Sequence, residues 1–309
     1  MKHRPFKQID VFTATPYFGN PLAVVLDGNR LDDASMQRFA RWTNLSETTF
    51  VLAPTQDTAD YRLRIFTPGG ELPFAGHPTL GTCHAWLEAG GQPKHKDVIV
   101  QECAKGLVFI QREASGTRLA QLAFAAPSLL RSVPSPTVLA QAASALGLKA
   151  SQITAAQLLD NGPVWLGLLL DSPETVLQLL PDHQALTKLG IKIGVAGIYT
   201  APSSPLIARA NREAQAFTHT ESTATELEAD LEVRAFAACM GINEDPVTGS
   251  LNASLAQWLM VDGFMPDRYI ASQGVCMGRR GQLDLKRDAQ GQVWVGGQSV
   301  TCIDGTVRL

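Results

Sequence analysis

The chain contains an internal repeat, and this repeat constrains the fold more than any other feature. The stretches 71–81 (ELPFAGHPTLG) and 244–250 (EDPVTGS) align without a gap, and each runs into an apolar helical pattern, Thr79 to Ala89 and Leu251 to Val261. One repeat over so long a distance favours two similar halves rather than a solenoid. The matching positions are Glu71 and Glu244, Pro73 and Pro246, Gly76 and Gly249, and Gly90 and Gly263, with an upstream echo in Arg64-Ile65-Phe66 and Arg234-Ala235-Phe236.

Both repeated loops have the chemistry of an anion site. A glycine at the start of a helix exposes unpaired backbone N–H groups, with the positive end of the helix dipole behind them. Such an end binds a carboxylate or a phosphate without a cationic side chain. The alternative is two ordinary capped core helices, which a single loop would favour. Two matched copies with different polar tips, His77 in one and Asp245 and Ser250 in the other, favour a shared site.

Composition excludes several classes of protein. With 309 residues, 45% of them hydrophobic, the chain can bury large cores and is expected to form two domains. A formal charge of −3 with 18% charged residues argues against nucleic acid or an anionic membrane as partner. No apolar run reaches membrane-spanning length, since the longest, Val164 to Leu170, ends at Asp171. Five scattered cysteines without a CxxC pair fit a reducing cytoplasm and no zinc site.

The expected elements make the chain α+β. Each half shows many short strands, such as Tyr61 to Phe66, around one apolar helix. Further helices are expected from Asp32 or Asp33 to Trp42, from Pro136 to Leu146, and after Ser172. The proline-rich stretch 127–136 is the best candidate linker. No GxGxxG or Walker-type loop is present, which argues against nucleotide binding.

Five motifs in this order resemble the PhzF-like family, named for the phenazine-biosynthesis isomerase. They are GNPLAVV (19–25), NLSETTF (44–50), ELPFAGHPTLG (71–81), EDPVTGS (244–250) and QGVCMGRRG (273–281). The resemblance implies the diaminopimelate epimerase-like fold, in which two similar domains each curl a sheet around a central helix and share one site. The domains would be 1–128 and 129–295, and the last strand, about 296–309, can return to the first. The resemblance also implies a homodimer without metal or cofactor.

The resemblance assigns site residues by position. Glu47 of the SET motif corresponds to the acid/base that moves a proton between carbons, and His77 and Asp245 correspond to groups that orient the substrate and assist the transfer. The remaining substrate-binding positions correspond to Ser46, Gly76, Gly249 and Ser250, with His77 belonging to both sets.

Each of these residues also has a simple structural explanation. Glu47 could be a solvent-facing strand residue, because glutamate is rarely buried. His77 and Ser250 could be helix caps, and Asp245 before a proline is a common turn residue. Only the ensemble favours a catalytic site, in which helix dipoles hold the substrate anion and a carboxylate abstracts a proton.

The sequence therefore predicts a cofactor-independent isomerase, related to phenazine-biosynthesis enzymes, that moves a proton within a small, cyclic carboxylic acid. One alternative is an amino-acid racemase or epimerase on the same fold, which would carry a cysteine in each loop. Ala75 and Thr248 stand before the two glycines instead, and Cys83 is expected to pack in the core. Another alternative is a catalytically silent protein that binds small acids.

Overall fold

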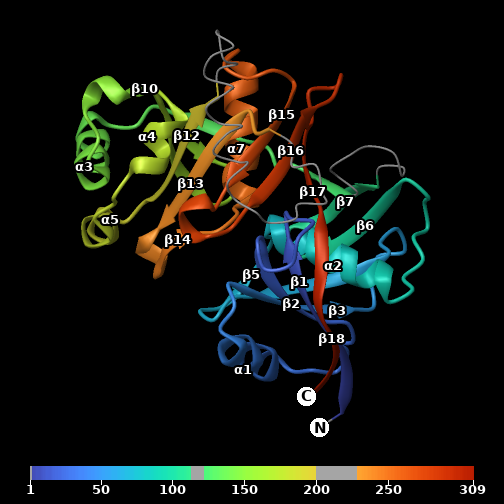
Figure 1. The fold of residues 1–309 in the computed structure, drawn as a ribbon. Coiled ribbons are helices and arrows are strands. Elements are labelled where there is room, and N and C mark those ends of the chain that lie inside the picture. The colour runs from blue at the N-terminus through green and yellow to red at the C-terminus, as the bar shows by residue number, and fades with distance from the viewer. Residues whose placement is uncertain (1, 113–121, 200–227) are drawn as a thin grey trace, which may run out of the picture.

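The computed structural model describes residues 2–112, 122–199 and 228–309. All described strands belong to one hydrogen-bonded network. Figure 1 shows this network divided into two curled halves, one around helix α2 (Gly76–Glu88) and the other around helix α7 (Gly249–Val261). The described helices include none that is long and apolar enough to cross a membrane.

The N-terminal half surrounds α2 with short strands, and helix α1 lies on its outside (Figure 1). Its elements are β1 (His3–Val11), β2 (Asn20–Val25), α1 (Asp33–Thr43), β3 (Glu47–Leu52), β4 (Tyr61–Phe66), β5 (Glu71–Leu72), β6 (Val98–Cys103), β7 (Gly106–Arg112), β8 (Leu122–Ala125) and the last strand of the chain, β18 (Ser299–Arg308).

The C-terminal half surrounds α7 in the same manner, with further helices on its outside (Figure 1). Its elements are β9 (Leu130–Ser132), α3 (Pro136–Leu146), η1 (Ala150–Gln152), β10 (Ile153–Asp160), β11 (Val164–Leu170), α4 (Pro173–Gln178), α5 (His183–Leu189), β12 (Lys192–Ile198), β13 (Leu231–Ala237), η2 (Ala238–Met240), β14 (Ile242–Asp245), β15 (Arg268–Gln273), η3 (Val275–Met277), β16 (Gly281–Arg287) and β17 (Val293–Gly297).

The two halves have the same strand topology. In the N-terminal half the strands are ordered β18, β1, β2, β3, β4, β6, β7, β8, and in the C-terminal half β9, β10, β11, β12, β13, β15, β16, β17. In both rows the senses of successive pairs are antiparallel, antiparallel, parallel, antiparallel, parallel, antiparallel and antiparallel. The repeat in the sequence is therefore a repeat of the whole sheet.

Local sequence explains where the outer helices begin and end. The Asp32 side chain accepts a hydrogen bond from the Ser35 N–H and so caps α1. Ser135 caps α3 in the same way, and Gly147 ends that helix with a positive φ of 71°. Ser172 caps α4. The predicted helix starts and the strand Tyr61–Phe66 are thus confirmed.

The two central helices begin earlier than their apolar patterns indicated. They start at Gly76 and Gly249 rather than at Thr79 and Leu251. The difference has a physical reason. A glycine-containing first turn has low helix propensity and shows no apolar periodicity, so the apolar pattern alone does not mark it as helical. The starts at the two glycines agree with the helix ends expected from the repeated loops.

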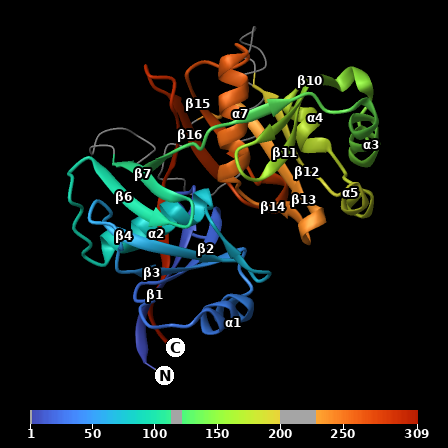
Figure 2. The ribbon, with the colours of Figure 1, turned by 180° about the vertical axis from the view of Figure 1, so that it is seen from behind.

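The chain crosses between the halves at two places. Figure 2 shows the first crossing in green, where β8 leads to β9. β9 pairs with β10, so the stretch 127–136 that was expected to be a linker contains a strand. At the second crossing, β17 pairs with β8 and the chain continues into β18, which lies along β1 from Ser299 to Arg308. The domain division near residue 128 stays a prediction.

Candidate active site

The N-termini of α2 and α7 meet backbone to backbone. A Cβ placed on Gly249 would lie 3.3 Å from the Gly76 Cα and 3.4 Å from the His77 amide nitrogen. A Cβ on Gly76 would lie 2.7 Å from the ring of Phe124. Only glycine fits at either position without a shift of its neighbours. Neither Ala75 nor Thr248, the residues before the helices, caps its helix with a side chain, so the first-turn N–H groups stay available for a ligand anion.

The Glu47 and His77 side chains face each other at this junction. The Glu47 Oε2 atom, at the start of β3, lies 3.0 Å from the His77 Nε2 atom in the first turn of α2. Their side chains are only 15% and 7% exposed. The two atoms are within ion-pair distance but are not aligned as a hydrogen bond, and neither has another hydrogen-bond partner among the described residues. Both therefore keep hydrogen-bonding capacity for a substrate.

The charge on His77 is stabilised by the acids around it. Burial by itself lowers the pKa of His77, but the negative charges of Glu47, Asp245 and Asp10 outweigh burial, and the pKa is raised above its ordinary value. A cationic imidazole is thus favoured next to a carboxylate. Either side chain of the pair can therefore carry the proton during a transfer.

Asn20 connects the two halves at the site. Its buried Nδ2 group donates to Asp245 Oδ1 at 3.0 Å and to the Val247 carbonyl at 2.9 Å. The same nitrogen lies 3.4 Å from His77 Nδ1, and Asn20 Oδ1 accepts a hydrogen bond from Ser46 Oγ at 3.2 Å. In the neutral histidine ring, Nδ1 would then be the acceptor and the proton would sit on Nε2, facing the Glu47 carboxylate.

Asp245 is a carboxyl group with perturbed acidity. Besides the contact with Asn20, its Oδ2 atom accepts a hydrogen bond from Thr248 Oγ1 at 2.7 Å. Burial raises the pKa of Asp245 to about 6, the charge of His77 opposes the shift, and the like charge of Glu47 adds to it. A group that titrates near neutral pH can act as an acid or a base in the physiological range.

The Gln273 side chain fixes the loop that precedes α7. Its fully buried amide accepts hydrogen bonds from the Thr248 N–H at 3.0 Å and from Asn252 Nδ2 at 2.8 Å. It donates to the Asp245 carbonyl and to Thr248 Oγ1, both at 2.9 Å. Gln273 therefore fixes the backbone of Asp245 and the start of α7 together.

Ser250 lies in the first turn of α7 and is not its cap. The Ser250 Oγ atom accepts a hydrogen bond from Trp165 Nε1 at 3.3 Å, and its carbonyl accepts one from Asn161 Nδ2 at 2.9 Å. The hydroxyl is therefore held by a residue of β11, and the carbonyl by the turn between β10 and β11.

The structure brings all the expected site residues to one place. Glu47, His77 and Asp245 lie with Ser46, Gly76, Gly249 and Ser250 around the junction of the two helices. Sequence reasoning assigned no role to Asn20 or Gln273, although both stand in motifs that carry the family resemblance. Asparagine at the start of a strand and glutamine at the end of one carry no local signal of a site.

The thiols and the potential metal ligands are the remaining reactive groups of the chain. All five cysteines are free thiols. Cys83 is fully buried in α2, as expected, and burial raises its pKa to about 12. Within the described ranges, no group of three or more His, Cys, Asp or Glu side chains could hold a metal ion.

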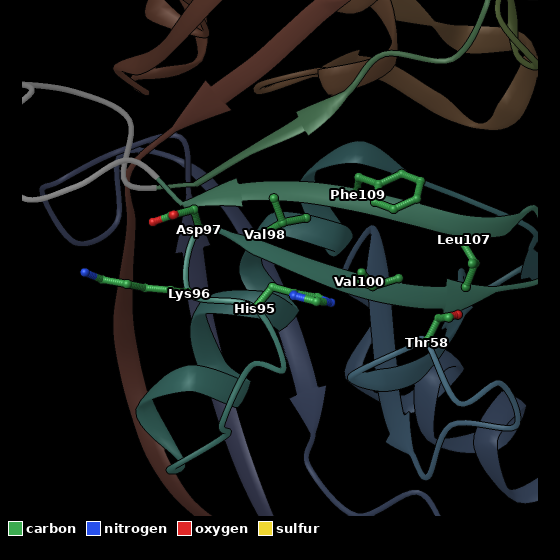
Figure 3. Close-up of a pocket in the computed structure, with 8 residues that line it drawn as sticks. All are labelled: Thr58, His95, Lys96, Asp97, Val98, Val100, Leu107 and Phe109. Carbon is green, nitrogen blue, oxygen red and sulfur yellow. The ribbon is translucent and has the colours of Figure 1, made fainter.

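A separate pocket of about 680 Å³ lies on the N-terminal half, over β6 and β7 (Figure 3). Its wall is largely apolar and includes Phe109, which is 48% exposed. No residue of the helix junction lines it, and it brings together no acid/base pair like that of Glu47 and His77. The lining residues are Thr58, His95, Lys96, Asp97, Val98, Val100, Leu107 and Phe109.

Comparison with known sequences identifies relatives over the full chain. The family of phenazine biosynthesis-like proteins (PhzC-PhzF) matches residues 9–305. The chain is 36% identical to "Antisense-enhancing sequence 1" of Schizosaccharomyces pombe, with 99% of both chains covered. It is 34% identical to the trans-2,3-dihydro-3-hydroxyanthranilate isomerase of Pseudomonas aeruginosa, covering 97% of this chain and 98% of that protein.

Comparison with solved structures identifies the fold. The Bacillus anthracis phenazine biosynthesis protein of the PhzF family matches with a TM-score of 0.79 at 22% identity over 100% of both chains. A probable proline racemase from Agrobacterium radiobacter matches with a TM-score of 0.60 at 11% identity, covering 99% of this chain and 92% of that one. The fold is α+β and diaminopimelate epimerase-like. The chain belongs to the phenazine biosynthesis-like family, and it is an isomerase.

Proposed function

We propose that this isomerase moves a proton within a small, cyclic carboxylic acid without a cofactor, and that Glu47 is its acid/base. The observation that carries the proposal is the Glu47–His77 pair, whose Oε2 and Nε2 atoms are 3.0 Å apart and mostly shielded from water. Glu47 opens β3, and His77 lies in the first turn of α2, where two helix ends without side-chain caps meet. The helix ends would hold the substrate carboxylate, and the pair would act on the adjacent carbon.

The proposed cycle uses one carboxylate twice. Glu47 takes a proton from carbon, and the helix dipoles stabilise the negative charge that develops on the substrate. Glu47 then returns the proton to another carbon of the same molecule. His77 and Asp245 orient the substrate and share the charge during the transfer. The Pseudomonas aeruginosa relative is named for isomerising trans-2,3-dihydro-3-hydroxyanthranilate, which makes that acid the first substrate to test.

The alternatives have less support. A two-thiol racemase would need a cysteine before each helix, and this chain has Ala75 and Thr248 there. A silent acid-binding protein would not need the Glu47–His77 pair. Solvent exchange separates these three possibilities. An acid that binds to the wild type in D₂O without rearrangement or carbon-bound deuterium would favour the binding protein, and change at one stereocentre alone would favour the racemase.

The decisive variant is Glu47→Gln, which keeps size and hydrogen bonding but cannot accept a proton at neutral pH. We expect turnover to fall by ~10²–10⁴, the usual scale of general acid–base catalysis. Substrate affinity, measured by calorimetry, should change little because the carboxylate is bound by backbone amides. Glu174→Gln, at an exposed site on α4, is the matched control and should keep full activity. Near-normal turnover in Glu47→Gln would refute the proposed role.

We further propose that the protein is a homodimer and works in the cytoplasm. The family resemblance supports the dimer, and five free thiols fit a reducing compartment. Light scattering on a sizing column measures the assembly, and a mass of one chain would contradict the dimer.

A further inference from the structure

Lys192 is a half-buried cation close to the N-terminus of α7. It opens β12 and pairs with Trp165 across the parallel β11–β12 ladder. The Lys192 Nζ atom lies 4.8 Å from the centre of the Trp165 ring, and the nitrogen of that ring donates to Ser250 Oγ. One indole therefore separates this cation from the first turn of the helix that is proposed to hold the substrate.

The strand register makes Lys192 the counterpart of Glu47. The repeated Arg-x-Phe motifs on β4 and β13 identify equivalent positions in the two halves. The residues that pair with the two phenylalanines are therefore equivalent as well. In each half the residue before that partner begins its strand, and this residue is Glu47 in the first half and Lys192 in the second. The register pairs are Thr48 with Phe66 and Ile193 with Phe236.

The strand ends place both residues at the same end of their sheets. In the C-terminal half, β10 ends at Asp160, β11 begins at Val164 and β12 begins at Lys192. Asn161, in the turn at this end, donates to the Ser250 carbonyl. In the N-terminal half, the corresponding end carries Glu47, which contacts the first turn of α2.

Lys192 has no ion-pair partner among the residues that the structure describes. Burial lowers the pKa of Lys192, and the charges of Cys239, Asp245 and Asp160 act in the opposite direction. Its cation is therefore partly desolvated and in contact with an aromatic face, and no carboxylate of the described residues lies within ion-pair distance of it. Such a cation next to an acid-binding site is suited to an anionic ligand group.

We propose that Lys192 binds a second anionic group of the substrate, so that the enzyme prefers a small dicarboxylic acid to a monocarboxylic acid such as the relative's substrate. This inference rests on the proposed function above. The two helix N-termini would bind one carboxylate, Glu47 would act on the carbon between, and Lys192 would bind the second carboxylate from the opposite half. Each half of the repeat would then supply one charged residue from the same strand position, a base from one and a cation from the other.

Two aromatic acids that differ by one carboxylate test the proposal. Benzoate carries one carboxylate, and isophthalate carries a second one on the same ring. Their affinities are measured by calorimetry at low salt for the wild type, Lys192→Met and Lys192→Arg. Lys188→Met, an exposed lysine on α5, is the control for the loss of one charge elsewhere. Circular dichroism confirms that each variant is folded.

We expect the wild type to bind isophthalate about tenfold tighter than benzoate, as one charge-assisted contact allows. Lys192→Met should lose this preference but keep its affinity for benzoate, whereas Lys192→Arg and Lys188→Met should retain it. Three results would overturn the inference: no preference in the wild type, the same preference in Lys192→Met, or lost turnover in Lys192→Met with unchanged affinity for both acids. Benzoate binding that is lost on Gly249→Val would still support the proposed function, while failure of both acids to bind would count against both.

Discussion

The loops that precede α2 and α7 are held by the same kind of ion pair but carry different polar side chains. Before each loop an arginine forms a two-pronged ion pair with the repeated glutamate, Arg64 with Glu71 at 2.7 Å and Arg234 with Glu244 at 2.9 Å. Each guanidinium also lies 5.0 Å from the ring of the phenylalanine two residues later. The repeat in the sequence therefore encodes a structural brace. The residues that differ between the loops supply the chemistry.

The braces differ in burial, and the loops differ in what they carry. The Arg64 and Glu71 side chains are 17% and 37% exposed, whereas those of Arg234 and Glu244 are 6% and 11% exposed. The first loop carries His77, which faces Glu47 from its own half. The second carries Asp245, which is held by an amide from the other half. One duplicated scaffold can thus place unlike groups on the two sides of one site.

The largest expected difference in stability between the two loops comes from replacing their arginines. Arg234→Met leaves the Glu244 carboxylate buried without its cation, and the carbonyls of Val176 and Leu179 without their donor. We expect the free energy of unfolding to fall by about 3–5 kcal/mol. Arg64→Met, at the more exposed brace, should cost only about 1 kcal/mol. Urea denaturation at pH 7 measures both.

The double variant Arg234→Met/Glu244→Leu is the control for the arginine experiment. It removes the stranded charge and should recover most of the lost stability. Equal losses in the two single variants would contradict the difference in burial.

A smaller effect is expected from the buried glutamines beneath the two helices. Gln273→Met removes four hydrogen bonds and leaves the Thr248 N–H without its acceptor, which should cost about 2–3 kcal/mol. The Gln101 side chain, under α2, accepts a hydrogen bond from Tyr61 and donates one to Thr79, so Gln101→Met should cost about 1 kcal/mol.

Acid binding distinguishes a positioning role from simple destabilisation at these glutamines. Gln273→Met should also weaken the binding of the substrate acid, because the start of α7 is no longer fixed, and Gln101→Met should leave the affinity unchanged. Calorimetry on the folded variants provides the readout. Unchanged affinity in Gln273→Met would show that the amide only stabilises the fold.

The smallest effects concern the dependence of stability on pH. The two loops should change stability in different pH ranges. Because the pKa of Asp245 is raised to about 6, the folded state binds this proton more tightly than the unfolded state. Wild-type stability should therefore fall by about 1–2 kcal/mol relative to Asp245→Asn as pH rises from about 4 to about 6. Asp262→Asn is a control of opposite sign, since its bond to Arg131 lowers the pKa of Asp262.

The first loop should respond at higher pH. The raised pKa of His77 gives a contribution that is complete below about pH 6.5 and is lost as pH rises through the pKa in the folded state. Urea denaturation at closely spaced pH values, with His77→Ala as reference, measures this loss. A single shared window for Asp245 and His77 would show that the two groups titrate as one coupled unit.

The features that depend on short stretches of chain could be predicted from the sequence. Caps such as Asp32 and Ser135 act through neighbouring N–H groups, so the starts of α1 and α3 could be predicted. The ungapped repeat indicated two similar halves and a pair of glycine-led helices. The motifs carried the family resemblance, and with it the candidate residues Glu47, His77 and Asp245.

How the two halves meet depends on contacts between residues that are far apart in the sequence. Asn20 reaches Val247 across 227 positions of the chain, and β18 pairs with β1 from the opposite end of the sequence. Such pairs leave no local pattern, because each partner by itself is compatible with an ordinary strand or turn. Lys192 shows this most clearly. In the sequence it is one lysine at the start of a strand, and it becomes the counterpart of Glu47 only when strand register fixes which residues lie opposite the repeated phenylalanines.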